Sequence, residues 1–219
     1  MNKKTALVFG GTGLTGSILI HHLNLDHRYE KVVIFTRRDI KFKSDKAEII
    51  NTDLSNIPDL SNHIVGDDLF CCLGTTLKKS ASKDEYKNIE RDIPAKVAEI
   101  ANINAVPNYI VVSSIGANIK SRNLYLRIKG EMEVEVQKYG FEKIIILRPS
   151  IIFGPRNEFR FFEELGKSLA RIFGFLFIGK FKKYRGIKAN TIAKAMIKLA
   201  NGPTGKKIFE SDEIQLSGQ

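Results

Sequence analysis

Short apolar runs alternate with longer segments of helical period along most of the chain. Six apolar runs predict strands, at residues 4–9, 31–35, 47–50, 67–73, 107–113 and 143–147. Three segments with apolar residues spaced three and four apart predict helices, at residues 14–25, 84–102 and 124–139. Continuous runs of Val, Ile and Leu are typical of strands buried on both faces of a parallel sheet. The alternation therefore predicts an α/β fold with a doubly wound parallel sheet and right-handed crossovers.

The pattern changes after Pro149. A Phe-rich segment at residues 159–181 is followed by a predicted helix at 190–201 and a short predicted strand at 207–209. The chain has no internal repeat, low-complexity tract or linker that would separate two domains. We therefore expect a single domain over residues 1–219, in which residues 150–219 contribute a small C-terminal cap on the substrate side.

Composition places the chain among ordinary folded proteins, with 43% hydrophobic and 27% charged residues. No apolar run approaches the roughly 20 residues that span a bilayer. The N-terminal segment MNKKTALVFGG lacks the cleavage site of a signal peptide. Cys71 and Cys72 are adjacent within an apolar run, which favours core packing and fits neither a disulfide framework nor a metal site. These features predict a cytoplasmic protein without a structural metal.

Positive charge is concentrated near the C-terminus. The formal net charge is +11, and the stretch from Leu165 to Phe209 contains eleven Lys and Arg residues and no Asp or Glu. The plainest interpretation is a solvated cap whose aromatic residues fill the core. The alternatives are a peripheral contact with an anionic membrane or an acidic partner through residues 165–209, or steering of an acidic substrate. No recognition motif accompanies the charge, so specific nucleic-acid binding is not expected.

The segment GGTGLTG spaces Gly10, Gly13 and Gly16 directly after the first predicted strand and at the start of a helix. In a dinucleotide site the first glycine permits a tight turn and the second lets the backbone approach a pyrophosphate. The third allows close packing of helix on strand, while the helix N-terminus attracts the anion. A turn without a ligand is the alternative, but the strand–turn–helix context favours a dinucleotide and a Rossmann fold.

The end of the second predicted strand indicates which dinucleotide is bound. A carboxylate at that point would bind the ribose 2′-OH of NAD. The sequence has Thr36, Arg37 and Arg38 there instead. Arginine can bind a 2′-phosphate with both arms of its guanidinium, so the pair favours NADP over NAD. The alternative is a pair of solvated surface arginines.

Two side chains of the helix after the fifth predicted strand suggest proton transfer. Tyr125 and Lys129 are four residues apart and therefore lie on one helical face. A nearby ammonium lowers the pKa of a tyrosine and suits it to exchange a proton with a carbonyl oxygen. Ser113 and Ser114 end the fifth strand at the expected cofactor cleft.

Four motifs in this order, GGTGLTG, IVVSS, YLRIK and RPSIIFGP, resemble the atypical or extended branch of the short-chain dehydrogenase/reductase superfamily. The resemblance implies a catalytic set in which Tyr125 is the acid or base and Lys129 holds the ribose and tunes the tyrosine. Ser114 would orient the substrate carbonyl, with Ser113 as the alternative. The implied function is NADPH-dependent reduction of a small carbonyl compound. A non-catalytic redox sensor or scaffold that binds NADPH is the competing hypothesis.

The resemblance also implies a wider set of cofactor contacts. Besides the three glycines, the two arginines, Tyr125 and Lys129, it includes Thr12, Leu14, Asp53, Leu54, Leu73, Gly74, Thr75, Pro149 and Ile152. One position departs from the superfamily pattern. A helix asparagine is expected near the segment IERD, where this chain has Glu90, with Asn88 close by.

Overall fold

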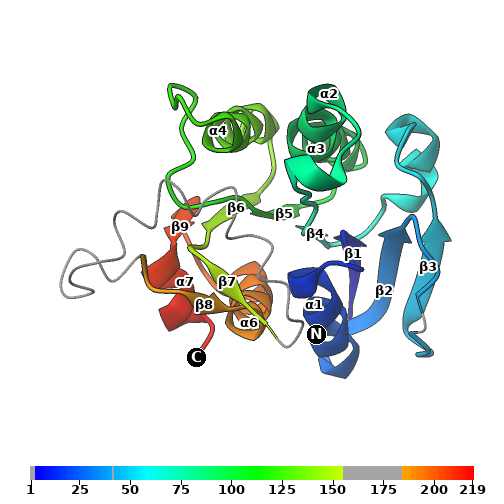
Figure 1. Ribbon diagram of the computed structural model, residues 1–219. Coiled ribbons are helices and arrows are strands. Elements are labelled where there is room, and N and C mark those ends of the chain that lie inside the picture. Colours follow the sequence, from blue (N-terminus) through cyan, green and yellow to red (C-terminus); the bar gives the residue numbers. More distant parts are fainter. Residues whose placement is uncertain (1–2, 41, 155–183) are drawn as a thin grey trace.

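The computed structural model describes residues 3–40, 42–154 and 184–219. Seven parallel strands form the central sheet in the order β3-β2-β1-β4-β5-β6-β9 (Figure 1). The strand order reverses at β1, which confirms the doubly wound Rossmann fold. The strands are β1 (Lys4–Phe9), β2 (Tyr29–Thr36), β3 (Ala47–Asn51), β4 (Asp68–Cys71), β5 (Asn108–Val112), β6 (Lys143–Arg148) and β9 (Ile208–Glu210).

Helices cover both faces of the sheet (Figure 1). One face carries α1 (Leu14–Leu25), α6 (Ala189–Asn201) and α7 (Ser211–Ser217). The other carries α2 (Lys83–Lys87), α3 (Ile93–Ile103) and α4 (Leu124–Val136). Alternate strand residues enter opposite core layers: Leu7 and Phe9 pack on the α3 side, Ala6 and Val8 on the α1 side. The continuous apolar runs of the sequence therefore reflect burial on both faces.

The helix predicted at residues 84–102 differs from the structure in its middle. Helix α2 passes into a π-helical turn, Asn88–Asp92, before α3 begins. Pro94 lies at the start of α3 and has no backbone N–H to donate to the preceding turn. The N–H of Ile93 instead reaches the carbonyl oxygen of Asn88, five residues back, which widens the helix at this point.

Part of the segment expected to form the cap builds the main layers. Helix α6 packs against α1, and β9 pairs with β6 at the edge of the sheet. The two-stranded sheet of β7 (Ile152–Phe153) and β8 (Ile187–Lys188) lies beside them (Figure 1). The Phe-rich segment at residues 159–181 falls outside the described residues. Six basic residues of the C-terminal stretch are described, and all are exposed: Arg185, Lys188, Lys194, Lys198, Lys206 and Lys207.

Short 3-10 helices, Ile57–His63 and Leu77–Lys79, complete the connections around β4. Within the described part of the chain, no helix has the length and apolar character needed to cross a membrane.

Candidate functional site

The carboxyl ends of the parallel strands lie at one edge of the sheet, and the glycine loop follows β1 at this edge. Gly10 has a positive φ of 83°, a conformation that favours glycine. A Cβ at Gly10 would also lie 2.6 Å from the carbonyl carbon of Cys72, at the end of neighbouring β4. Both the turn and the close approach of two backbones therefore require glycine at this position.

Gly13 and Gly16 differ in what surrounds them. A Cβ on Gly16 would overlap the carbonyl oxygen of Gly10, so this glycine lets α1 pack closely on β1. At Gly13 the nearest atom to an added Cβ is the same oxygen at 3.3 Å, and the residue is exposed. The protein thus leaves space beside Gly13 that a Cβ would enter. Helix α1 begins there without a side-chain cap, so its first N–H groups fit a pyrophosphate.

The turn after β2 presents the two arginines. The Thr36 hydroxyl accepts a hydrogen bond from the Arg38 N–H at 3.1 Å and donates one to the Arg38 carbonyl oxygen at 2.8 Å. Arg37 and Arg38 are both exposed. Hydrogen bonding from Ser55 lowers the pKa of Asp53, and the charge of Arg37 lowers it further. The ends of β2 and β3 therefore place the charge of Arg37 near Asp53 and leave two exposed guanidinium groups available to an anion such as a phosphate.

Leu54, which follows Asp53, has a positive φ of 63° and is buried. This left-handed conformation occurs three residues after the end of β3 at Asn51. Asp53 and Leu54, both predicted to contact the cofactor, therefore have different environments. Asp53 is exposed, whereas Leu54 is packed in the core.

Tyr125 and Lys129 are both buried on α4. The helix begins after Asn123, whose side chain accepts a hydrogen bond from the Leu126 N–H at 3.2 Å. Lys129 Nζ lies 2.7 Å from Oε2 of Glu90 and 3.4 Å from the carbonyl oxygen of Val112. Tyr125 packs against the buried ring of Tyr86.

Burial lowers the pKa of Lys129, but the charges of Glu90 and Tyr125 act in the opposite direction, and the net effect is a raised pKa. The lysine is therefore an ammonium at neutral pH.

The two candidate serines have different partners. Ser113 Oγ donates a hydrogen bond to Glu133 Oε1 at 2.5 Å. The guanidinium of Arg148 contacts both Glu133, at 2.9 Å from Nε, and Glu210, at 3.2 Å from Nη1. Ser113 therefore belongs to a partly buried network that joins α4 to β6 and β9. The Ser114 hydroxyl makes a longer contact, 3.3 Å, with the carbonyl oxygen of Ile115.

The loop after β4 is held by a hydrogen bond to the side chain of Glu90. Thr75 donates its backbone N–H to Oε1 of Glu90 at 2.5 Å. Gly74 is exposed, and a Cβ on it would lie 3.5 Å from the same oxygen. Leu73 is half-buried and packs against the core on the α3 side. This loop, predicted to contact the pyrophosphate and ribose, therefore rests on a carboxylate.

The segment after β6 reaches the glycine loop. Pro149 is buried at the end of β6, and Ile152 begins β7. Two residues further, Gly154 lies so close to the side chain of Leu14 that a Cβ would overlap it. Thr12, at the tip of the glycine loop, is half-buried. The structure therefore brings the predicted nicotinamide segment and the predicted pyrophosphate loop to the same edge of the sheet.

Sequence reasoning missed the roles of three charged residues at this edge: Glu90, Glu133 and Arg148. The replacement of the expected helix asparagine by Glu90 was the available signal, because a carboxylate inside a buried helix needs a charged partner. Its partner, Lys129, lies on a different helix and could not be assigned from spacing.

The adjacent cysteines pack in the core, as their apolar setting predicted. Cys71 is buried, and Cys72 Sγ lies 3.8 Å from Sδ of Met196. Burial raises the pKa of both thiols, so neither is a thiolate at neutral pH.

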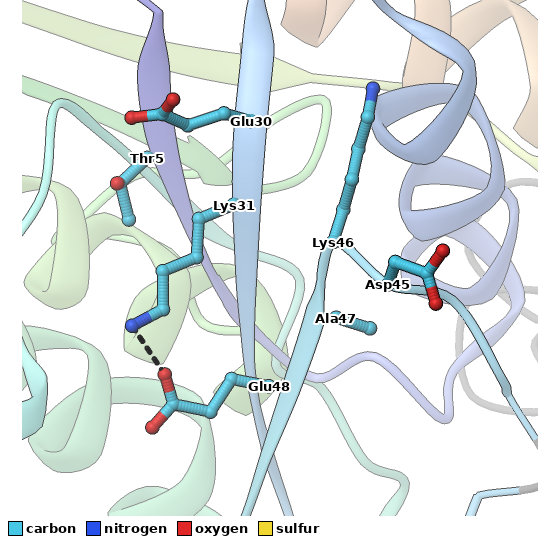
Figure 2. Close-up of a pocket in the computed structure, with 7 residues that line it drawn as sticks. All are labelled: Thr5, Glu30, Lys31, Asp45, Lys46, Ala47 and Glu48. Carbon is cyan, nitrogen blue, oxygen red and sulfur yellow. Dashed lines mark ion pairs between the residues drawn. The ribbon is translucent and has the colours of Figure 1, made fainter.

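A hollow at the opposite edge of the sheet is lined by charged residues near the starts of β1, β2 and β3 (Figure 2). Lys31 and Glu48 form an ion pair across it at 2.5 Å. Because the glycine loop lies at the other ends of these strands, the hollow is separate from the candidate site.

Comparison with known proteins identifies relatives. A family described as NAD(P)H-binding matches residues 10–168. Protein HTATIP2 of Rattus norvegicus is 32% identical over 180 residues, which cover 79% of this chain and 71% of that protein. Protein FMP52, mitochondrial, of Saccharomyces cerevisiae is 30% identical over 205 residues, covering 91% of this chain and 89% of that protein.

Solved structures share the fold. MoeE5 in complex with UDP-glucuronic acid and NAD has a TM-score of 0.70 at 18% identity, over 93% of this chain and 74% of that one. The UDP-N-acetylglucosamine 4-epimerase from Methanobrevibacter ruminantium M1 also has a TM-score of 0.70, at 20% identity, over 95% of this chain and 76% of that one. At these identities the likeness establishes the Rossmann fold alone.

The predicted cytoplasmic location is wrong by this comparison, because several relatives from yeasts are named as mitochondrial proteins. The composition argument was too weak to choose a compartment. The cysteine usage and the apolar pattern of the sequence are compatible with more than one reducing compartment.

The matched family covers most of the chain, the HTATIP2 relative is 32% identical over 71% of its length, and the fold has the glycine loop at the expected edge. The chain therefore belongs to the NAD(P)H-binding family, within the atypical, extended branch of the short-chain dehydrogenase/reductase superfamily.

Proposed function

We propose that the protein reduces a small carbonyl compound with NADPH. The observation that carries this proposal is the buried pair of Tyr125 and the charged Lys129 on α4, at the edge of the sheet where the glycine loop opens. A phenol beside an ammonium is an arrangement that donates a proton to a carbonyl oxygen. The chemistry that bound NADPH supplies is transfer of a hydride to the carbonyl carbon.

The choice of NADPH rests on the turn after β2. Arg37 and Arg38 are exposed at the point where a carboxylate would select NAD, and the Thr36 hydroxyl holds the backbone of Arg38 through two hydrogen bonds. A guanidinium offers two parallel donors to a phosphate and keeps its charge at all physiological pH values. We therefore infer that these arginines bind the 2′-phosphate, while the space beside Gly13 takes the pyrophosphate.

Each catalytic side chain has a separate task in this proposal. Tyr125 donates the proton that the carbonyl oxygen gains as the carbon is reduced. Lys129 stabilises the resulting tyrosinate through its positive charge and binds the ribose hydroxyls. Ser114 orients the carbonyl oxygen, because the hydroxyl of Ser113 is already engaged by Glu133.

The competing proposal is a non-catalytic NADPH sensor or scaffold. The observation that favours it is the pairing of Lys129 with Glu90, which offsets the ammonium charge next to Tyr125. A compensated charge lowers the pKa of a tyrosine less than an isolated one does.

The two proposals separate in a reduction assay. A panel of small aldehydes, ketones and quinones is screened by the loss of NADPH absorbance. In Tyr125→Phe we expect the rate to fall by about 10²–10⁴, the usual effect of removing a positioned acid, while NADPH affinity is kept. Tyr139→Phe, a half-buried tyrosine beyond the end of α4, is the matched control. Undiminished activity in Tyr125→Phe would remove the mechanism. Tight NADPH binding without reduction of any carbonyl would favour the sensor.

A further inference from the structure

Glu90 contacts two segments of the candidate site at once. It lies in the middle of the π-helical turn Asn88–Asp92, and its side chain is 1% exposed. Oε1 accepts the backbone N–H of Thr75, in the loop after β4, at 2.5 Å. Oε2 lies 2.7 Å from Nζ of Lys129 on α4. The carboxylate therefore joins two elements that are far apart in the sequence.

This arrangement is costly if it serves only to hold the fold. Removing two charges from water costs several kcal/mol per ion, and buried ion pairs can often be replaced by apolar residues without loss of stability. The π-helical turn that positions Glu90 also gives up regular helical hydrogen bonding, and such turns frequently occur at functional sites. The cost and the location together indicate a role in the site.

The charge state of Lys129 depends on its surroundings. The groups that face it are Glu90 from the π-helical turn, Tyr125 from its own helix, and Cys71 and Cys72 from the end of β4. Cysteine and tyrosine are neutral at pH 7 by their ordinary pKa values, and burial raises the pKa of both thiols further. Among these groups, Glu90 therefore provides the negative charge. Without it, burial would dominate and lower the pKa of the lysine.

We propose that Glu90 is the positioning residue that keeps Lys129 protonated and fixed at the dinucleotide site. It replaces the neutral asparagine expected at this helix position by a counter-charge, and it couples the lysine to the loop that carries Thr75. The part of this inference that concerns dinucleotide binding rests on the proposed function. The part that concerns the charge of Lys129 does not.

The charge of Lys129 can be measured directly by NMR of protein labelled with carbon-13 at lysine Cε. The Lys129 resonance is assigned by its absence from Lys129→Met. In the unaltered protein we expect it to stay protonated up to about pH 10, the ordinary limit for lysine. In Glu90→Gln we expect its midpoint to fall below about pH 9, since burial without a counter-charge can lower a lysine pKa by several units. Glu90→Asp, which keeps the charge, should retain a protonated Lys129 at pH 9.

NADPH binding supplies the second measurement. Dissociation constants are obtained from nucleotide fluorescence between pH 7.5 and 9.5. In Glu90→Gln the constant should rise about tenfold across this range, the worth of one charge-assisted contact, as Lys129 loses its proton. The unaltered protein and Glu99→Gln, which removes an exposed carboxylate paired with Lys96 on α3, should change less than about twofold. The rise should vanish when Lys129→Met is added to Glu90→Gln.

Two results would overturn the inference: a Lys129 that stays protonated at pH 9.5 in Glu90→Gln, or one that already titrates below pH 9 in the unaltered protein. The second of these results concerns the unaltered protein, so it can be tested even if Glu90→Gln does not fold. Neither experiment needs a substrate, so a failure to find carbonyl reduction affects the proposed reaction and leaves this inference intact.

Discussion

Each edge of the parallel sheet contains a buried carboxylate, and the two have different kinds of partner. Asp68 begins β4 and is completely buried. It lies 3.1 Å from Nζ of Lys4 and accepts hydrogen bonds from the hydroxyl of Tyr29 at 2.5 Å and the side-chain amide of Asn108 at 2.7 Å. These three partners come from the starts of β1, β2 and β5. Asp68 therefore ties together four neighbouring strands of the sheet.

Glu90 is the buried carboxylate at the opposite edge of the sheet. Its partners are the Thr75 loop and Lys129, which belong to the edge where the glycine loop opens. At the Asp68 edge, the side-chain amide of Asn201 on α6 donates a hydrogen bond of 2.7 Å to the hydroxyl of Tyr29 and so extends the network to this helix. Burial, and then the charge of Asp68, raise the pKa of Tyr29, so it remains a hydrogen-bond donor. One edge therefore stabilises the sheet, and the other carries the groups of the proposed dinucleotide site.

The largest effect that this comparison predicts is on stability. Asp68→Ala removes the acceptor shared by Lys4, Tyr29 and Asn108, and we expect it to cost about 3–5 kcal/mol, the usual penalty for breaking a buried charged network. The midpoint of thermal unfolding should fall by roughly 6–20 °C. NADPH affinity, measured below the transition, should be unchanged.

Asp45→Ala is the matched control for Asp68→Ala, because Asp45 lines the hollow at the same edge and is exposed (Figure 2). Its effect on unfolding should be within about 0.5 kcal/mol. If Asp68→Ala weakened NADPH binding as strongly as it lowered stability, the separation of the two edges would be wrong.

Gly13 and Gly16, at the start of α1, offer the same comparison between a residue that stabilises the fold and a residue of the proposed binding site. Gly16→Ala places a methyl group against the backbone oxygen of Gly10, and we expect a loss of about 1–3 kcal/mol of stability. Gly13 has φ −75° and ψ 170°, which alanine also adopts, and a Cβ there would lie 3.3 Å from the Gly10 carbonyl oxygen, so Gly13→Ala should cost about 1 kcal/mol. Its methyl group would enter the space assigned to the pyrophosphate and should weaken NADPH binding about tenfold or more.

Thermal unfolding and nucleotide fluorescence titration on both variants provide the check. The assignment of the pyrophosphate to Gly13 fails if Gly13→Ala binds NADPH with unchanged affinity, and the packing role of Gly16 fails if Gly16→Ala is as stable as the unaltered protein.

Much of this arrangement could be predicted because it depends on local sequence. The strand β1, the helix α1 and the three glycines between them are adjacent in the chain, and the turn requires glycine for reasons visible in the sequence. The predicted bounds of β1 and α1 agree with the structure. The same holds for the facing positions of Tyr125 and Lys129, since a spacing of four fixes them on one side of a helix.

The remainder depends on contacts between distant segments. The pairing of Glu90 with Lys129 joins two helices, and no spacing rule connects them. The choice between Ser113 and Ser114 required the position of Glu133 on another element. The π-helical turn is an exception, because Pro94 within the predicted helix is a local signal that regular helical hydrogen bonding is interrupted there. Strand β9 was expected as a short strand, but its place in the main sheet follows from its pairing with β6.

The last prediction concerns cofactor choice and tests whether the proposed dinucleotide site recognises the 2′-phosphate itself as well as negative charge in general. Replacing Arg37 and Arg38 together by Ala should narrow the preference for NADPH over NADH by about tenfold or more, because each charge-assisted contact to the 2′-phosphate is lost and NADH lacks that group. Thr36 should keep the turn folded through its bonds to the Arg38 backbone, which alanine retains.

The control removes the same amount of positive charge elsewhere, at Lys31 and Lys96. Their ion pairs with Glu48 and Glu99 lie on the surface. That control should weaken both nucleotides alike and only at low salt, since long-range attraction is screened within a Debye length of about 10 Å at 0.1 M. Titrations of both nucleotides at two salt concentrations separate these effects. Equal affinity of the unaltered protein for NADPH and NADH would reject the assignment of the arginines to the 2′-phosphate.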